Sequence, residues 1–174
     1  VVTGVQTCAL PILIGVDPAK RVFQLHGAHA DGSVAFRKKL SRGQLIAFVA
    51  QQPKCLIAME ACATAHGWGR AFEALGHDVR LIPPSYVKPF VKRQKNDVAD
   101  AEAIVEAAMR PTMRFVVVKT EDQQARAMLF RTRQMFVGQR TQMINALRGH
   151  LAEHGLVAAR GPAHLKQLVD ALAD

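Results

Sequence analysis

The sequence has few of the features that mark secreted, disulfide-stabilised or membrane-spanning proteins. It has three cysteines in 174 residues, an odd number without metal-ligand spacing, so we expect reduced thiols as in cytoplasmic proteins. No stretch approaches the ~18 consecutive apolar residues that a membrane-spanning helix needs. The first residues also lack the basic segment that opens a signal peptide. The sequence therefore predicts a cytoplasmic protein with no membrane partner.

The sequence also has fewer acidic than basic residues. Lysine and arginine together number 23 against 14 aspartates and glutamates, which gives a net charge of +9 and a pI of about 10. Hydrophobic residues make up 49% of the chain, enough for a folded core. A basic globular protein suggests a polyanionic partner, most commonly nucleic acid. The alternative is a protein that is merely soluble and basic.

The order of apolar runs and turn residues predicts an α/β fold. Three short strands in succession favour a meander, and the strands that then alternate with helices favour a mixed sheet flanked by helices. Strands are expected at 12–17, 21–28, 33–40, 54–61 and 78–83, with one more at 114–119; helices are expected at 43–52, 67–75, 97–109, 121–155 and within 162–173. Residues 84–96 are expected to form a basic connection. Residues 1–12 have no clear period, and we expect them to be a non-native-looking segment.

Four carboxylates occupy positions typical of a metal site. Asp17 and Glu60 each end an apolar strand, at the edge where open α/β sheets bind ligands. Asp97 and Asp100 are three residues apart on a predicted helix and so share a face. Two carboxylates 4 Å apart repel by about 4 kcal/mol at an effective dielectric constant of 20. A divalent cation would offset this repulsion, and oxygen-only ligands favour magnesium, with manganese as the alternative.

Each carboxylate also has an ordinary structural interpretation. Asp17 precedes Pro18 and could form a turn. Glu60 could pair with Arg70 or Lys20. Asp97 and Asp100 could stabilise the first turn of their helix. These alternatives stay open from the residues alone.

The sequence motifs around the four carboxylates resemble those of a known family. IGVDPAK at residue 14, AMEACATAHGWGRAF at residue 58 and KNDVADAEAIVEA at residue 95 resemble the DEDD transposases of the IS110 family of bacterial insertion sequences. The likeness covers about residues 12–155. It implies a ribonuclease H-like fold of the RuvC type, followed by a long helical coiled-coil segment.

The resemblance also implies a function and partners. It assigns Asp17, Glu60, Asp97 and Asp100 as catalytic residues that hold Mg²⁺ (Mn²⁺ as the alternative), in a transposase that recombines DNA with a structured guide RNA in a bacterial cytoplasm. It implies a catalytic domain at 13–119, a helix at 120–156 that assembles a homo-oligomer, and the start of a truncated C-terminal region at 157–174. The family takes its serine nucleophile from a further C-terminal domain. This sequence has only Ser33, Ser41 and Ser85, none in matching context, so we expect no complete strand exchange from it.

Two groups of basic residues are candidates for nucleic-acid binding. The first precedes Asp97 directly and consists of Lys88, Lys92, Arg93 and Lys95; phosphate contacts there would lie beside the carboxylates, and the alternative is a solvated loop. The second recurs every seven residues on the long helix and consists of Arg126, Arg133 and Arg140. These arginines would follow phosphates or guide RNA, or flank a coiled-coil seam at Leu129, Phe136 and Met143.

Two other function classes compete with a metal-dependent recombinase. One is a non-catalytic fragment that binds nucleic acid or dimerises. The other is a phosphotransferase of the actin-like or sugar-kinase type, whose fold also opens with a strand like IGVD. That type needs a glycine-rich or hydroxyl-bearing turn after the aspartate, and Pro18-Ala19-Lys20 does not supply one.

Overall fold

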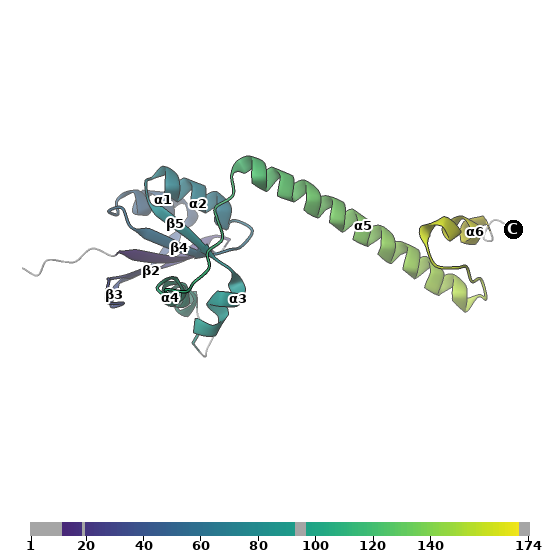
Figure 1. Cartoon of the computed structure of the whole chain (residues 1–174), viewed down its shortest axis with the longest axis horizontal. Coiled ribbons are helices and arrows are strands. Elements are labelled where there is room, and N and C mark those ends of the chain that lie inside the picture. The colour runs from purple at the N-terminus through teal and green to yellow at the C-terminus, as the bar shows by residue number, and fades with distance from the viewer. Residues whose placement is uncertain (1–11, 19, 93–96, 171–174) are drawn as a thin grey trace, which may run out of the picture. The chain divides into compact units, whose positions relative to one another are not determined.

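The structure of the chain is a computed structural model that describes residues 12–18, 20–92 and 97–170, without the side chains of Asp97, Val98 and Pro162. It divides into two compact units, residues 1–120 and 121–174. The first unit holds a five-stranded sheet with helices on both faces, and the second holds a long helix and a short return segment (Figure 1).

The sheet has the mixed topology expected from the sequence. Its strands are β1 (Leu13–Pro18), β2 (Val22–Ala28), β3 (Val34–Ser41), β4 (Leu56–Glu60) and β5 (Asp78–Ile82), in the spatial order β3-β2-β1-β4-β5. The meander strands pair antiparallel, whereas β1, β4 and β5 pair parallel. Gly32, in the Asp31-Gly32 turn between β2 and β3, has a positive φ of 83°, which glycine adopts at little cost. The expectation of a mixed sheet flanked by helices is confirmed.

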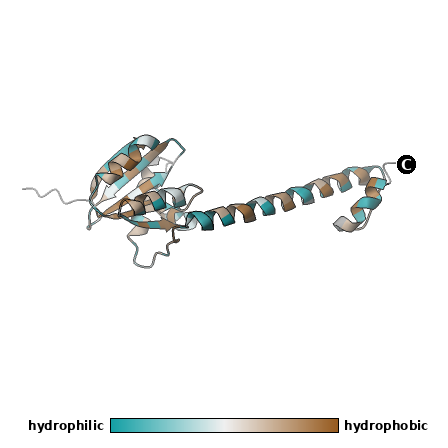
Figure 2. Ribbon diagram, turned by 90° about the horizontal axis from the view of Figure 1, so that it is seen from above, coloured by the Kyte–Doolittle hydropathy of each residue, from teal (hydrophilic) through white to brown (hydrophobic). Residues whose placement is uncertain are grey.

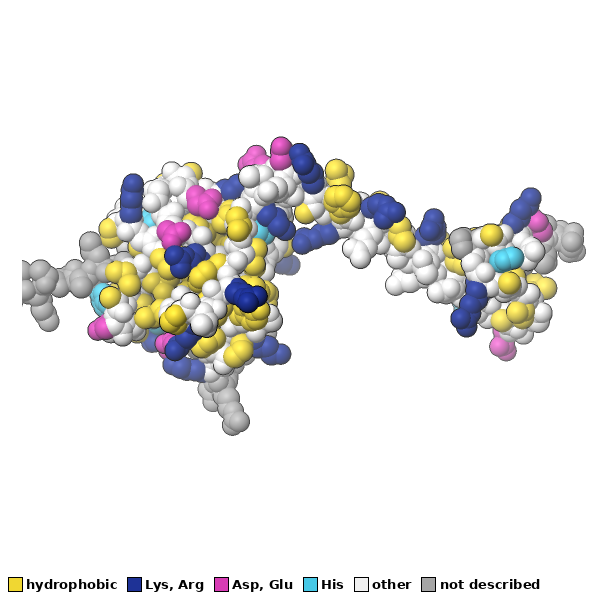
Figure 3. Space-filling model, viewed as in Figure 1, with side chains coloured by type: hydrophobic (Ala, Val, Ile, Leu, Met, Phe, Trp, Pro, Cys, Tyr) yellow, Lys and Arg dark blue, Asp and Glu magenta, His cyan; other side chains and the backbone are white. Residues whose placement is uncertain are grey.

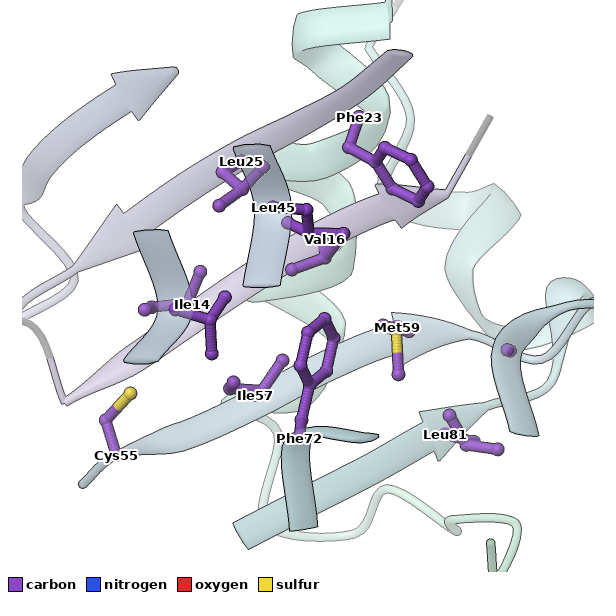
Figure 4. Close-up of a cluster of buried hydrophobic side chains, with 12 residues drawn as sticks. Ile14, Val16, Phe23, Leu25, Leu45, Cys55, Ile57, Met59, Phe72 and Leu81 are labelled. Carbon is purple, nitrogen blue, oxygen red and sulfur yellow. The ribbon is translucent and has the colours of Figure 1, made fainter. Parts of the chain in front are cut away.

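Helices α1 (Arg42–Ala50) and α2 (Ala65–Ala74) cover one face of the sheet, and α4 (Asp97–Ala108) covers the other (Figure 1). Strand residues alternate between the two faces, so the core has two layers. Ile14, Val16, Ile57 and Met59 pack under α1 and α2, as Figure 4 shows. The layer under α4 contains residues of the opposite parity, among them Leu13 and Ala58.

The single tryptophan belongs to the α1 and α2 side of the first unit. The Trp68 ring lies edge-on to Phe23 with 4.9 Å between ring centroids, and stacks on Phe72 at 5.9 Å. The guanidinium of Arg42 lies 4.9 Å from the centre of the Trp68 ring, a cation–π distance. Trp68 therefore joins β2, α1 and α2 within one cluster.

Two segments differ from the sequence-based expectations. Residues 84–90 form two short helices, α3 (Pro84–Val87) and the 3-10 helix η1 (Lys88–Phe90), where we expected only a connection. Residues 114–119 make a single bridge, between Leu81 and Val116, and no strand. Their side chains pack instead: Val116 and Val118 against one core layer, and Phe115 against the other. The expected strand at 114–119 is therefore wrong.

The second unit begins with α5 (Glu121–Glu153), one unbroken helix of 33 residues. Gly138 and Gly149 do not interrupt it, and a Cβ at either position would meet no atom within 4 Å. Apolar and polar residues are interspersed along α5 (Figure 2), and Leu129, Phe136 and Met143 are exposed. The chain then folds back through the 3-10 helix η2 (Pro162–His164) to α6 (Leu165–Asp170). Among the described residues, no helix is both long and apolar enough to cross a bilayer.

Candidate functional site

Asp17 and Glu60 lie side by side at the carboxyl ends of two neighbouring parallel strands. The register of β1 and β4 aligns Val16 with Met59, and Asp17 and Glu60 each follow one residue later. Both alternate with residues that pack under α1 and α2, so both belong to the α4 face of the sheet. Each side chain is partly buried. The two strands thus direct two carboxylates to one edge of one face.

Helix α4 reaches this edge because β1 carries a glycine where the helix crosses it. A Cβ on Gly15 would lie 2.6 Å from the carbonyl oxygen of Ala101 and 2.7 Å from Cγ2 of Val105, closer than any real side chain approaches. The backbone of α4 therefore lies directly on β1, two residues before Asp17. Asp100 precedes Ala101 and is partly buried, so the same contact fixes Asp100 near the strand ends.

The electrostatics agree with this proximity. The pKa of the Glu60 carboxyl is raised, first by burial and second by the negative charge of Asp100. None of the described cations forms an ion pair or hydrogen bond with Glu60, and the alternatives Arg70 and Lys20 are not its partners. The Arg70 guanidinium donates instead to the carbonyl oxygen of Lys119 at 2.8 Å. The site therefore holds negative charge that the described side chains leave unneutralised around Glu60.

Because burial and the charge of Asp100 disfavour an ionised Glu60, we predict that Glu60→Gln stabilises the metal-free protein at neutral pH. A carboxyl whose pKa is raised by folding binds more protons in the native state, so stability falls as pH rises from its unfolded pKa through its folded pKa. The amide removes the charge and hence this loss. Thermal unfolding in EDTA is the measurement: the variant should melt above wild type at pH 7, and the difference should shrink as pH falls below about 4. Equal melting temperatures at pH 7 would contradict the repulsion.

The donor atoms of this edge suit a hard divalent cation. Asp17, Glu60 and Asp100 offer carboxylate oxygens only, which favours magnesium or manganese over zinc. The unneutralised charge beside Glu60 is what such a cation would offset. Among the described residues, however, no group of three acidic, histidine or cysteine side chains comes close enough to count as a metal cluster. Asp97 begins α4, and its side chain lies outside the described part.

The first basic group is only partly described. Lys88 belongs to η1 and is exposed. Lys92 forms an ion pair with Glu102 of α4, which Arg37 of β3 also contacts at 3.2 Å. Exposed ion pairs of this kind contribute at most about 1 kcal/mol, so nucleic acid could replace Glu102 as the partner of Lys92. Arg93 and Lys95 lie outside the described residues.

The second basic group lies on α5. Arg126, Arg133 and Arg140 are all exposed, and α5 carries its acidic first-turn residues at Glu121 and Asp122. Figure 3 shows dark-blue side chains along this helix. The group keeps its nucleic-acid role as a prediction, because exposure alone fits a coiled-coil flank equally well.

Two features of the structure were not expected from the sequence. Gly15 received no role, although a glycine inside a buried strand often marks a close backbone approach. Arg148 and Arg160 were also missed; they line a pocket with Arg140 in the second unit. The sequence indicates this pocket only in part, through Gly155 and Gly161. Both glycines have a positive φ and allow the chain to turn back.

Comparisons with known proteins identify a family. The family model of IS110-type DEDD transposases, described as "Transposase", matches residues 14–155. A Sinorhizobium fredii protein named as transposase y4pF/y4sB is 49% identical over 162 residues, 93% of this chain and 42% of its own length. The Yersinia enterocolitica transposase for insertion sequence element IS1328 is 47% identical over 156 residues, 90% of this chain and 47% of its own.

The chain spans less than half the length of the curated relatives it matches.

Among solved structures, Thermus thermophilus RuvC in complex with a Holliday junction substrate superposes with a TM-score of 0.47 at 16% identity. That superposition covers 60% of this chain and 98% of the RuvC chain.

Proposed function

Because this chain belongs to the IS110-type family of DEDD transposases, we propose that its first unit cleaves DNA phosphodiesters, with Asp17, Glu60, Asp97 and Asp100 as the catalytic, metal-holding residues. One observation carries the proposal: Asp17 and Glu60 end adjacent parallel strands on the face covered by α4, and burial, followed by the charge of Asp100 on α4, raises the pKa of Glu60. Structural carboxylates are usually paired with cations, whereas a concentration of negative charge at a sheet edge is typical of a site.

Each carboxylate has a distinct place in the proposed chemistry. Asp17 and Glu60 project from rigid strands and would hold the cation at a fixed point, and Asp100 and Asp97 would close the site from the first turn of α4. The bound Mg²⁺ or Mn²⁺ would polarise the phosphodiester and lower the pKa of an attacking water. Gly15 fixes the height of α4 over β1, and therefore acts as a positioning residue for Asp100.

Nucleic-acid binding and assembly complete the proposal. Lys88, Lys92, Arg93 and Lys95 would hold the DNA backbone beside the carboxylates, and Arg126, Arg133 and Arg140 would contact DNA or a structured guide RNA. The net charge of +9 supports a polyanionic partner. Exposed Leu129, Phe136 and Met143 support a homo-oligomer through the helix at 120–156. We propose a bacterial cytoplasmic location, and domains at 13–119 and 120–156 with a further region beginning at 157.

A second candidate is a chain that binds nucleic acid or dimerises without turnover. It is favoured by one observation: among the described side chains, no three acidic, histidine or cysteine groups come close enough to hold a metal. The actin-like phosphotransferase has lost its support, since the chain belongs to a different family.

Cleavage of a branched DNA tests the proposal. We expect the chain with Mg²⁺ to nick a labelled four-way junction, and to do nothing in EDTA. We also expect no covalent protein–DNA adduct on denaturing gels, since none of Ser33, Ser41 and Ser85 stands in a context that matches the family's serine nucleophile. Binding without any nicking would favour the second candidate. An adduct mapped to Ser33, Ser41 or Ser85 would show a nucleophile inside this chain.

A further inference from the structure

The second unit contains a basic pocket where the chain folds back onto α5. Helix α5 ends at Glu153, and Gly155, with a φ of 77°, reverses the chain. The amide of Leu156 donates to the carbonyl oxygen of Leu151 at 3.0 Å, which fixes the reversal. The returning residues 158–161 and residues 140–148 of α5 line an open pocket of about 600 Å³.

Three arginines line this cavity. Arg140 and Arg148 come from α5 and Arg160 from the return segment, together with the polar side chains of Thr141 and Asn145. No aspartate or glutamate is among the lining residues. Three guanidinium groups around one hollow repel one another unless an anion neutralises them. The composition of the lining thus selects a negatively charged ligand.

Among the three arginines, Arg148 gives the most specific evidence for an anion site. Its Nη2 donates to the carbonyl oxygens of Ala159 at 2.7 Å and Gly161 at 2.6 Å, so the return segment holds the side chain in place. Its Nε, in contrast, is buried and has no hydrogen-bond partner among the described atoms. A buried donor without a partner is unfavourable, because it has lost its hydrogen bond to water without gaining another. A guanidinium fixed in this way is suited to an oxyanion, above all to the oxygens of a phosphate.

The surroundings of the pocket indicate where the phosphate comes from. Between Asp122 and Glu153, α5 carries five arginines and no acidic residue. Arg126, Arg133 and Arg140 recur every seven residues, about 10.5 Å apart along the helix. Arg140 belongs both to this row and to the pocket. A row of cations that leads into an anion site fits a polymer of phosphates better than a free ion.

We propose that the pocket formed by Arg140, Arg148 and Arg160 binds a backbone phosphate of a nucleic-acid strand that runs along α5. The inference rests on the proposed function only in taking nucleic acid as the ligand, since the pocket and the carboxylates belong to different units. Thr141 already donates its hydroxyl to the carbonyl oxygen of Val137 at 2.9 Å, so the arginines and the Asn145 amide are the available donors.

The Nε–Hε resonance of Arg148, followed in the ¹⁵N-labelled full chain, tests the pocket directly. Arg148→Lys identifies the resonance by its loss. Inorganic phosphate and a single-stranded 12-nucleotide DNA are the two probes. We expect both to shift the resonance, and the oligonucleotide to do so at a concentration at least about tenfold lower, because neighbouring phosphates also meet the arginine row.

Paired charge-removal variants test the effect on affinity. Arg140→Gln with Arg160→Gln should weaken oligonucleotide binding at 0.1 M salt about 25-fold, since each lost phosphate contact lowers the log–log salt slope by about 0.7 on single strands. Arg131→Gln with Lys166→Gln removes the same charge outside the pocket, and should weaken binding less than about threefold. Fluorescence anisotropy across a salt series gives both values.

Each contrary outcome has a separate meaning. Equal losses in the two double variants would overturn the pocket and leave only general charge attraction. A shift with inorganic phosphate alone would make this a site for the free ion, and would overturn the nucleic-acid assignment. No shift with either probe would show that Arg148 only holds the return segment. Failure of junction cleavage, with the Arg148 shift intact, would count against the proposed function alone.

Discussion

Asp100→Asn is expected to lower Mg²⁺-dependent cleavage of a four-way junction by at least about 10³-fold. The change keeps the shape of the side chain but halves the number of its acceptor oxygens and removes its charge. Metal-assisted stabilisation of developing charge is worth several kcal/mol, and each 1.36 kcal/mol corresponds to tenfold in rate. Single-turnover cleavage under saturating protein measures the effect on the chemical step.

A matched control separates this effect from general loss of acidity on α4. Glu106 lies on the same helix and pairs with Arg110 at 2.7 Å, so Glu106→Gln should cleave within about threefold of wild type. Thermal unfolding adds a readout that is independent of activity: Mg²⁺ at 100 times its Kd should stabilise wild type and Glu106→Gln by about 2.7 kcal/mol. Asp100→Asn should lose most of that stabilisation. Equal metal-induced shifts in all three proteins would refute a metal site at Asp100.

Gly15→Ala is expected to destabilise the first unit by about 1–3 kcal/mol and to impair cleavage as well. An alanine in a strand is ordinarily better than glycine by about 0.5–1 kcal/mol. Here the new Cβ would lie 2.6 Å from the Ala101 carbonyl oxygen, a backbone atom that can move only if α4 moves. Overpacking of this kind typically costs 1–3 kcal/mol. The displaced helix would carry Asp100 away from Asp17 and Glu60.

Gly43→Ala is the control for this substitution. Gly43 lies in α1, and a Cβ there would meet nothing within 4 Å, so the change should stabilise the protein by about 0.5–1 kcal/mol. Urea unfolding of both variants gives the two free energies with opposite signs. If Gly15→Ala were as stable as wild type, α4 would not rest on β1 as described, and the positioning role of Gly15 would be abandoned.

The sheet was predictable because its local signals agree with its tertiary environment. Strand β2 alternates apolar and polar residues, and β4 is a continuous apolar run, as its two covered faces require. The segment at 114–119 was wrongly predicted as a strand because its valines and phenylalanine favour strands. Their side chains fill gaps in two core layers instead, and one backbone bridge is all that remains. Periodicity cannot distinguish an extended packed segment from a paired strand.

The sequence predicts which carboxylates end strands and which share a helix face, but not how the helix lies against the sheet. Asp17 and Glu60 follow from apolar strands that end in a charge. The height of α4 over the sheet depends on Gly15 meeting Ala101, a contact between residues 86 positions apart in the sequence. The partner of Lys92 is Glu102, a pairing that depends on how the chain turns between them. Long-range contacts of this kind leave no periodic trace in a single sequence.

The position of Trp68 gives the two units separate optical signals. The indole lies between Phe23 and Phe72 in the first unit, and the chain has no other tryptophan. Its fluorescence therefore reports melting of residues 1–120 alone. Far-ultraviolet ellipticity is weighted toward α5, which at 33 residues is longer than α1, α2 and α4 combined. Fluorescence and ellipticity thus follow the first unit and the arginine-bearing helix separately in an unlabelled sample, and non-coincident transitions would mean that the two melt independently.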